Sequence, residues 1–475
     1  MFSCSANAIE DPNIVTNAET VEIIIEPEMI DKDYSLWQNN TRSFLTADLS
    51  SIVSDDSSNL AWGTSYVLNS FCRAYNATGD VIYLEKAAGY IYQIFQLAVD
   101  NDGDGYKSWG TAEYNANKTY EEFCVHVGAV LTSVGEFINL VYSTPSILTQ
   151  KVVADMTYDE FCKYIVKEAT ENMIPAFDCD WNDEIGVYMN RPGSGNFSGA
   201  TSPISLPNNQ FLAMAATLIQ FAKVSPDKED LYLYRANAML EAFKSKLKYD
   251  ASGNLTTWNY KDVYFSRDYA ASKEDYSHGM FDTRAAIMGY NNGLAFNNDD
   301  IAAFARAYEI TMLAGTDSEP LLYQFVDGTG TDNNQLFLHI FDLAPFGTNN
   351  KIWEIGYKTA VYRNHFATRD AARILIYHEN APTPLSFSLL TPRNDAKYYG
   401  RMLFRWEVSV YSCKYTLQIS DKEDFSFLIV SRDNILDTSV YVDGLPSGKT
   451  LYWRVIASNQ SGKSVTSNTH IITTN

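Results

Sequence analysis

The segment from Lys273 to Arg284 reads Lys-Glu-Asp-Tyr-Ser-His-Gly-Met-Phe-Asp-Thr-Arg, and the rest of the chain is organised around it. Asp275 is a favourable N-cap, and helical steps from it place His278 one turn further on and Asp282 another turn beyond, all on one face. Phe281 leaves the helix in another direction and can pack into a core. The pattern predicts a helix anchored on one side that presents ionisable groups on the other, which is a candidate catalytic face. The alternative is that Asp275 only caps the helix and that His278 is only a hydrogen-bond partner of this cap.

The bulk composition predicts a multidomain protein that binds sugar rings. A chain of 475 residues is too long for one ordinary core. Its 8 Trp, 32 Tyr and 25 Phe are many, and surplus aromatic residues are typical of clefts that bind rings, with carbohydrate as the first candidate. The net charge of -22 and the lack of a basic run argue against nucleic acid. We therefore expect a monomer that binds a polysaccharide or oligosaccharide.

The N-terminus carries a localisation signal. Phe2-Ser3-Cys4-Ser5 resembles the end of a bacterial lipoprotein signal, in which a small residue precedes the Cys that is lipidated. The following residues, to about Asn40, are acidic and turn-rich like a tether. No stretch approaches the roughly 20 apolar residues of a membrane helix, so we expect membrane contact only through the lipid anchor. These features predict a lipid-anchored protein of the bacterial outer membrane, at the cell surface or in the periplasm; the alternative is a chance Cys near a terminus.

Residues 41–380 are predicted to be helical throughout. Their apolar periodicity is repeatedly that of helices, with no alternating strand run between them. The expected helices are Leu60–Asn76, Tyr83–Val99, Glu121–Tyr142, Tyr158–Met173, Asn209–Val224, Leu231–Lys246, Ser277–Tyr290, Asp299–Leu313 and Glu354–Tyr377. The turns indicate helical hairpins, and the longer connections between hairpins contain Trp109, Trp181 and Trp258 in turn. A ring of such hairpins would gather the polar helix starts at one end.

Residues 381–475 change to an all-β pattern of short alternating runs separated by Asp, Gly and Pro turns. Phe404-Arg405-Trp406, the run from Tyr415 to Ile419 and Tyr452-Trp453-Arg454-Val455 resemble a fibronectin type III sandwich. Such modules are usually spacers or weak binders, so we place no chemistry there. The predicted organisation is a tether over 1–40, a helical domain over 41–380 and a β-sandwich over 381–475.

The helical hairpins resemble the (α/α) toroid, an incomplete α/α barrel, of polysaccharide lyases and glucuronyl C5-epimerases. Pro207-Asn208-Asn209-Gln210 and Glu274-Asp275-Tyr276-Ser277-His278-Gly279 each open a helix in the manner of that family, and the resemblance covers roughly Trp62 to Ala367. It implies a lyase that cleaves a uronate-containing acidic polysaccharide by β-elimination and requires no cofactor. Several toroid lyases carry Asn-Asn-His where this chain has Asn208-Asn209-Gln210, so His278 or His126 has to supply the base.

Abstracting the proton next to a uronate carboxyl group requires a base and a group that stabilises an enolate-like charge. His278 and Tyr276 are the leading acid–base pair. The side-chain amides of Asn208 and Asn209 could stabilise the enolate-like charge on the substrate, although both Asn residues could instead only cap a helix. His126 and Arg284 are further catalytic candidates. The residues expected to bind substrate are Trp109, Trp181, Tyr188, Arg191, Trp258, Tyr260, Glu274, Asp275, Asp282, Arg363 and His365.

A calcium loop is predicted at Asp100, Asp102 and Asp104, which stand at positions one, three and five of a loop with Gly at position six. Position twelve is Thr111, so Glu113 would have to complete the site, and a solvated turn is the alternative.

Three functions stay open at the level of sequence. The first is a lyase, with a C5-epimerase as a close variant. The second is a glycoside hydrolase that pairs Glu274 or Asp275 with Asp183 or Glu184. The third is a non-catalytic glycan-binding surface lipoprotein in which the Trp loops alone bind the ligand.

Overall fold

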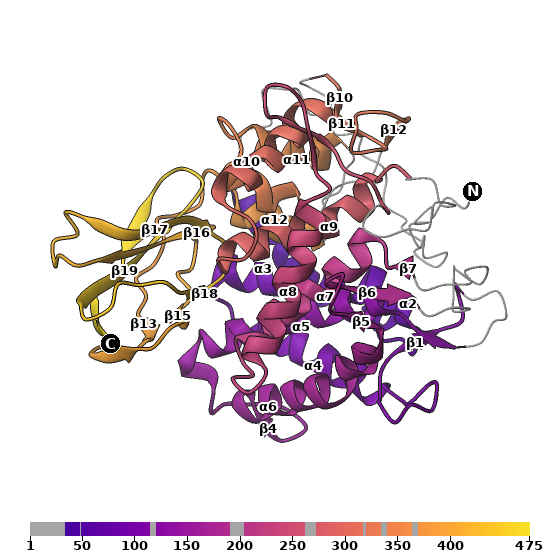
Figure 1. The fold of residues 1–475 in the computed structure, drawn as a ribbon, viewed down its shortest axis with the longest axis horizontal. Coiled ribbons are helices and arrows are strands. Elements are labelled where there is room, and N and C mark those ends of the chain that lie inside the picture. The colour runs from indigo at the N-terminus through magenta and orange to yellow at the C-terminus, as the bar shows by residue number, and fades with distance from the viewer. Residues whose placement is uncertain are drawn as a thin grey trace. The chain divides into compact units, whose positions relative to one another are not determined.

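The computed structural model describes residues 34–47, 49–114, 120–190, 204–261, 272–316, 320–333, 340–362 and 369–475. Residues from Asp33 onwards form one compact unit. In this unit a helical part is followed by a β-rich part, which appears in yellow and orange in Figure 1, and the predicted order of the two is confirmed. Cys4 and the predicted lipid anchor lie outside the described residues. Helix α1 (Tyr34–Ser43) packs on α12 (Arg369–Ile376), so the helical part begins earlier than the predicted tether boundary at residue 40.

The helices form an inner and an outer layer. The inner helices pack side by side in the order α12, α3 (Ser65–Thr78), α5 (Cys124–Tyr142), α7 (Asn208–Ala222) and α9 (Tyr276–Asn291). The outer helices that pack on them are α1, α4 (Ile82–Gln96), α6 (Tyr158–Glu168), α8 (Glu229–Lys244) and α10 (Asn298–Arg306). The 3-10 segment η10 (Ile340–Phe346) contacts α9, α10 and α11 (Lys351–Tyr362). This succession of hairpins is typical of an (α/α) toroid.

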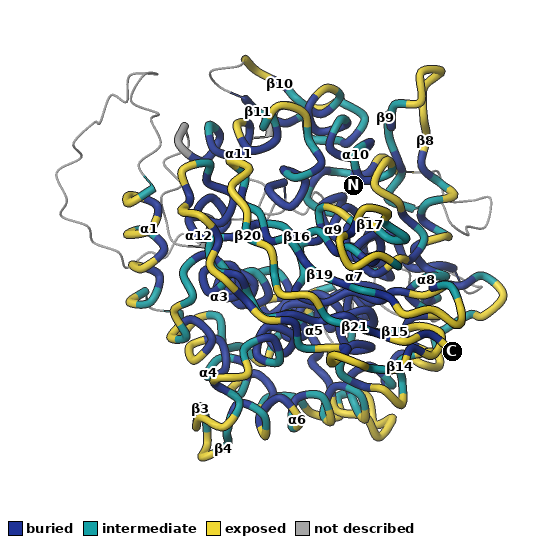
Figure 2. Tube along the Cα trace, turned by 90° about the vertical axis from the view of Figure 1, so that its left-hand side faces the viewer, coloured by how far each residue is buried: buried dark blue, intermediate teal, exposed yellow. Residues whose placement is uncertain are grey.

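Burial explains why α5 and α7 lie inside. Nearly every residue of both helices is buried, and Figure 2 shows them in dark blue while α6 and the β3–β4 turn carry exposed yellow segments. A helix that is apolar on all sides requires neighbours all round. By length and composition α5, with a mean hydropathy of 1.5, could cross a membrane, a possibility that the sequence analysis overlooked. Because 94% of its apolar window is buried in the structure, α5 is a core helix.

One expectation about the helical part is confirmed in part and another is wrong. The helix expected over Glu354–Tyr377 is described as α11, up to Tyr362, and α12, from Arg369, and residues 363–368 lie outside the described residues. Short strands also interrupt the helices, although none was expected, because runs this short are too brief for alternation to show in the sequence. These strands are β1 (Gly110–Thr111), β2 (Glu121–Glu122), β3 (Lys151–Val153), β4 (Met156–Thr157), β5 (Trp181–Asn182), β6 (Val187–Asn190), β7 (Ile204–Ser205), β8 (Lys248–Tyr249), β9 (Leu255–Thr257), β10 (Leu313–Gly315), β11 (Pro320–Tyr323) and β12 (Asp332–Asn333).

The β-rich part consists of two sheets around one core. One sheet has the order β13 (Leu389–Thr391), β15 (Met402–Trp406) and β18 (Ser439–Val442). The other has the order β14 (Ala396–Tyr398), β21 (His470–Thr474), β19 (Thr450–Ser458), β16 (Lys414–Ser420) and β17 (Leu428–Ile435), with β20 (Ser464–Thr466) also on β19. Phe404 and Trp406 of the first sheet and Leu417 and Trp453 of the second belong to one buried cluster. Two sheets that share a core are typical of a β-sandwich.

The β-rich part contacts the C-terminal ends of the inner helices. Arg405 of β15 donates hydrogen bonds to Asn139 Oδ1 near the end of α5, at 2.9 Å, and to the carbonyl oxygen of Lys223 at the end of α7, at 3.3 Å. Lys223 Nζ lies 2.9 Å from Asp437 Oδ2, and the Tyr290 hydroxyl at the end of α9 donates to a carbonyl oxygen of β17. Cationic side chains suit helix C-termini, where the helix dipole is negative. The N-termini of these helices therefore lie at the opposite end, which the β-rich part leaves uncovered.

Candidate active site

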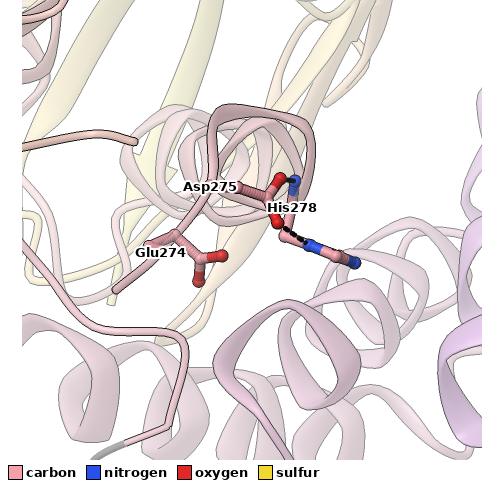
Figure 3. A group of neighbouring side chains, drawn as sticks. All are labelled: Glu274, Asp275 and His278. Atoms are coloured by element: carbon pink, nitrogen blue, oxygen red, sulfur yellow. Dashed lines mark hydrogen bonds and ion pairs between the residues drawn. The ribbon is translucent and has the colours of Figure 1, made fainter. Parts of the chain in front are cut away.

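The predicted cap and its histidine form a pair at the N-terminus of α9. Asp275 Oδ1 accepts hydrogen bonds from the backbone N–H groups of Ser277 and His278, at 2.9 and 3.1 Å. Asp275 Oδ2 lies 2.5 Å from His278 Nδ1, as Figure 3 shows, and the second ring nitrogen points away from the carboxylate. The two side chains keep 31% and 23% of their surface exposed. The pair therefore combines a fixed histidine orientation with access from outside.

Asp275 is ionised at every working pH. Burial acts to raise its pKa, but the hydrogen bond from His278, the charge of that ring and the bond from Ser277 outweigh burial and lower the pKa to about 2. A carboxylate that accepts a hydrogen bond from Nδ1–H holds the imidazole in the tautomer whose Nε2 can accept a proton. The His278–Asp275 pair is thus arranged as a general base.

A short loop places an aromatic ring beside this pair and a lysine beside that ring. The ring centroids of Tyr260 and His278 lie 5.1 Å apart, and Lys261 Nζ lies 5.4 Å from the Tyr260 ring centroid. Sequence reasoning selected Tyr260 but overlooked Lys261, whose only signal is its place directly after the aromatic loop. Burial lowers the pKa of Lys261.

Hydrogen bonds fix this loop to two inner helices. At the start of α7, Asn208 donates its backbone N–H to Tyr260 O at 3.1 Å and its amide Nδ2 to Asn259 O at 2.7 Å. Trp258 Nε1 donates to Asp282 Oδ2 of α9 at 2.8 Å. Asn208 is fully buried and positions the loop, and Asn209, next to it, is 2% exposed, so the predicted contact of both amides with charge on the substrate stays a prediction.

Glu274 and Asp282 form a buried carboxyl pair behind the site. Both side chains are fully buried, and their role in binding substrate stays a prediction. Burial, and then the negative charges of Asp282 and Asp275, raise the pKa of Glu274 well above its ordinary value. One ligand atom from each of Glu274, Asp275 and His278 lies within 4.8 Å of the others, so this group could also hold a cation.

Half-buried aromatic side chains form a floor at the same end of the inner helices. Trp62, Tyr66 and Phe123 pack against a buried cluster that includes Phe281, which lies one turn after His278 on α9. The ring centroids of Trp62 and Phe281 are 5.6 Å apart. Sequence reasoning missed this floor because it looked for aromatic residues in the Trp-bearing loops, although Trp62, Tyr66 and Phe123 stand at helix starts.

The predicted ring-stacking residues in the loops are largely buried. Trp109 is 1% exposed and donates from Nε1 to Ile94 O at 2.8 Å, while Trp258 and Tyr188 are fully buried. These three side chains fill the core, and their contact with a sugar stays a prediction. Trp181 is half-buried, with the Arg235 guanidinium 5.1 Å from its ring centroid. The remaining predicted binding residues, Arg191, Arg363 and His365, lie outside the described residues.

Three predicted catalytic residues also lie in the core. His126 is 2% exposed, its Nδ1 is 2.9 Å from Ser57 Oγ, and burial lowers its pKa to about 3, so it is neutral. Tyr276 is 3% exposed. Arg284 is 6% exposed and its NH2 group lies 2.6 Å from Glu136 Oε1. In the structure these side chains are engaged in packing and pairing, and their action on a substrate stays a prediction.

Arg284 belongs to a polar chain that crosses the interior of the helical part. Arg373 of α12 donates to Asn69 of α3, whose amide group donates to Glu136 of α5, and Glu136 pairs with Arg284 of α9. The chain thus connects four inner helices, and α7 lies between α5 and α9 in the packing order.

At the predicted calcium loop, the exposed carboxylates of Asp100, Asp102 and Asp104 each bring an oxygen within 4.8 Å of the others. Asp100 accepts hydrogen bonds from two glycine N–H groups of the loop, at 2.7 and 3.1 Å. Thr111 instead bonds Asp56 at 2.9 Å, and Glu113 accepts from Ser58, so neither is directed to the loop. Calcium binding stays a prediction that lacks the twelfth-position ligand.

A comparison with known protein families finds no match, and a comparison with curated proteins finds none either. Among solved structures, the chain is similar to a D-mannose isomerase at 13% identity, covering 72% of this chain and 85% of that one, with a TM-score of 0.42. Its C-terminal part is similar to an Fn3-like protein from Clostridium thermocellum at 18% identity, covering 20% of this chain and 94% of that one, with a TM-score of 0.15. Similarities this distant give no basis for inferring chemistry. The chemical argument therefore rests on the site geometry.

Proposed function

We propose that the chain is a carbohydrate-active enzyme in which an (α/α) toroid carries the active site and a fibronectin type III-like sandwich supports it. Within that class we propose a polysaccharide lyase that cleaves a uronate-containing polysaccharide by β-elimination. The observation that carries the proposal is the His278–Asp275 pair, with its Nδ1···Oδ2 distance of 2.5 Å and its half-exposed ring at the uncovered end of the helices. A fixed, accessible imidazole is suited to proton abstraction at neutral pH.

In the proposed reaction, His278 Nε2 takes the proton from C5 of a uronate ring. The electron pair of that C–H bond forms the C4–C5 double bond, and the bond from C4 to the glycosidic oxygen breaks. Tyr260, whose ring centroid lies 5.1 Å from that of His278, gives its hydroxyl proton to the leaving oxygen. Tyr260 replaces the sequence-based choice of Tyr276, which is buried. The proton on His278 then returns through solvent to Tyr260, so that no water is consumed.

The hydrolase alternative has less support. A glycosidase needs two carboxyl groups that flank the scissile bond, with room for the sugar between them. The carboxyl groups that lie together here, Glu274 and Asp282, are both fully buried. Asp183, a predicted partner, instead accepts a hydrogen bond from Trp181. The half-buried floor of Trp62, Tyr66 and Phe123 supports glycan binding under either reaction, and would be sufficient for a non-catalytic binding protein.

The test is incubation of the full chain with a panel of uronate polysaccharides, followed by ultraviolet absorbance and mass measurement of the fragments. A lyase gives fragments with a conjugated double bond and no added water, and His278→Ala should lower turnover by about a hundredfold or more. His470→Ala, in the β-rich part, is the matched control and should keep turnover. Fragments heavier by one water and without the absorbance would make the protein a hydrolase. An altered uronate without cleavage would indicate an epimerase, and binding without any reaction would indicate a binding protein.

A further inference from the structure

A small polar cavity lies where the β-rich part meets the inner helices. Its walls are formed by α3, α5 and α7 and by residues 436–438, which connect β17 to β18. The cavity has a volume of ≈ 30 Å³. A single buried water molecule needs on the order of 10–15 Å³, so the cavity has room for one or two molecules of that size.

Three buried polar atoms of the cavity lining have no hydrogen-bond partner within the described part of the protein. They are Arg73 Nε and Asn76 Oδ1 of α3 and Gln220 Nε2 of α7. Arg73 is 8% exposed and Gln220 is 1% exposed. Proteins satisfy nearly all of their buried polar atoms, because a buried donor or acceptor without a partner loses its hydrogen bonds to solvent. The three atoms therefore indicate a ligand that forms hydrogen bonds inside the cavity.

The charged groups of the lining are already paired with one another or with close neighbours. Glu136 Oε1 lies 2.6 Å from Arg284 NH2, and Asp437 Oδ2 lies 2.9 Å from Lys223 Nζ. The NH2 group of Arg73 lies 3.1 Å from a carboxylate oxygen of η10. Because each of these charges has a partner of opposite sign, the cavity does not require an ion to neutralise it.

The lining matches a small neutral molecule that both donates and accepts hydrogen bonds. An anion could accept from Arg73 and Gln220, but the carboxylates of Glu136 and Asp437 would face it. A cation would face the Arg73 guanidinium, and an apolar molecule would leave all three polar atoms unsatisfied. Water accepts from two donors and donates to acceptors, and a buried water molecule typically makes about three hydrogen bonds.

We propose that this cavity is a binding site for one or two ordered water molecules, which bridge Arg73 and Asn76 of α3 to Gln220 of α7. The inference goes beyond the proposed function and does not depend on it. Glu136 belongs to the polar chain that crosses the helical part, and Asp437 belongs to the contacts of the β-rich part, yet both line this cavity. The bound water therefore lies between these two polar systems and hydrates the contact between the two parts of the chain.

The first test is a high-resolution crystal structure of the full chain, with crystals grown once in chloride and once in bromide. The expected result is electron density within about 2.7–3.2 Å of Gln220 Nε2, Arg73 Nε and Asn76 Oδ1 in both crystals. This density should show no anomalous bromine signal. A cavity without density would overturn the inference, and a bromine signal in the cavity would show that it binds an anion instead.

Two substitutions of Asn76 provide a test in solution, where oxygen-17 relaxation counts long-lived internal water molecules. Asn76→Leu removes the unpartnered acceptor and fills the space with an apolar side chain, so the count should fall by about one or two relative to the wild type. Asn76→Ser is the matched control, because it keeps a hydroxyl acceptor and leaves room, and its count should not fall. Equal counts in the wild type and the leucine variant, or an equal fall in both variants, would contradict the inference.

Discussion

Charged side chains at the two ends of the inner helices differ in burial and in pairing. At the C-terminal end, Lys223 and Arg405 are buried and directed to carboxylate and carbonyl oxygens of the other part of the chain. At the N-terminal end, His278 and Asp275 remain half-exposed, and their pairing leaves one ring nitrogen available. The difference indicates that the first end contributes to stability and the second to chemistry. Substitutions at either end test this division of roles.

The largest effect is expected at the closed end. Asp437→Ala leaves the fully buried Lys223 ammonium without its partner at 2.9 Å, which should lower the free energy of unfolding by about 3 kcal/mol. Lys223→Met combined with Asp437→Ala should recover most of that loss, because no uncompensated charge stays buried. Chemical denaturation measures both. The division of roles fails if the folded single variant loses turnover, or if the double variant is no more stable than the single one.

A smaller effect on stability, with a defined pH dependence, is expected at the open end. The pKa of Asp275 falls from its ordinary 3.8 to about 2 in the folded protein, so the folded state favours the ionised form. The resulting stabilisation is complete above the unfolded pKa and is lost as the pH falls from about 4 to about 2. Asp275→Ala should therefore lower the free energy of unfolding by about 2 kcal/mol near neutral pH, with the deficit shrinking in acid.

The control for that variant is Asp275→Asn, which keeps an N-cap acceptor and removes the charge. It should recover part of the stability but not the catalytic activity, since the amide does not hold His278 in the basic tautomer. Equal deficits for the alanine and asparagine variants at every pH would show that Asp275 contributes no charge effect.

The smallest effect is expected at Glu274, in the buried carboxyl pair next to the site. The pKa of the buried Glu274 carboxyl group is raised, so the folded state holds its proton more tightly than the unfolded state does. Wild-type stability should therefore decline as the pH rises above the unfolded pKa, while Glu274→Gln removes this term. Relative to wild type, the variant should become progressively more stable as the pH rises above the unfolded pKa, and it should keep its turnover. Parallel pH profiles for the two proteins would contradict the assignment.

The sequence could predict the helices and the cap because both depend on local patterns. Asp275 precedes a helical run and has the side chain that caps it, and the apolar periodicity of α5 and α7 is continuous. The β-rich part was equally visible in its alternation. Such features involve residues only a few positions apart, so no knowledge of the tertiary contacts is needed.

The burial of individual side chains could not be predicted from such local patterns. Trp109 and Trp258 stand in polar loops, yet both are buried, because each loop folds back over the core and its indole N–H finds an acceptor there. Trp62 lies in a helical run whose pattern predicts a buried position, yet its side chain is only half-buried. Exposure depends on which distant segments cover a residue, and Arg284 pairs with a residue 148 positions away.

The chain of contacts from Arg373 through Asn69 and Glu136 to Arg284 has a consequence for the path of a polymer ligand. It spans the interior of the helical part, and the β-rich part contacts the C-terminal ends of the inner helices. Among the described residues, both features oppose the passage of a polymer from one end of these helices to the other. Under the proposed function, a released fragment leaves by the opening through which the next chain enters, and the reaction should be slowed competitively by its own product.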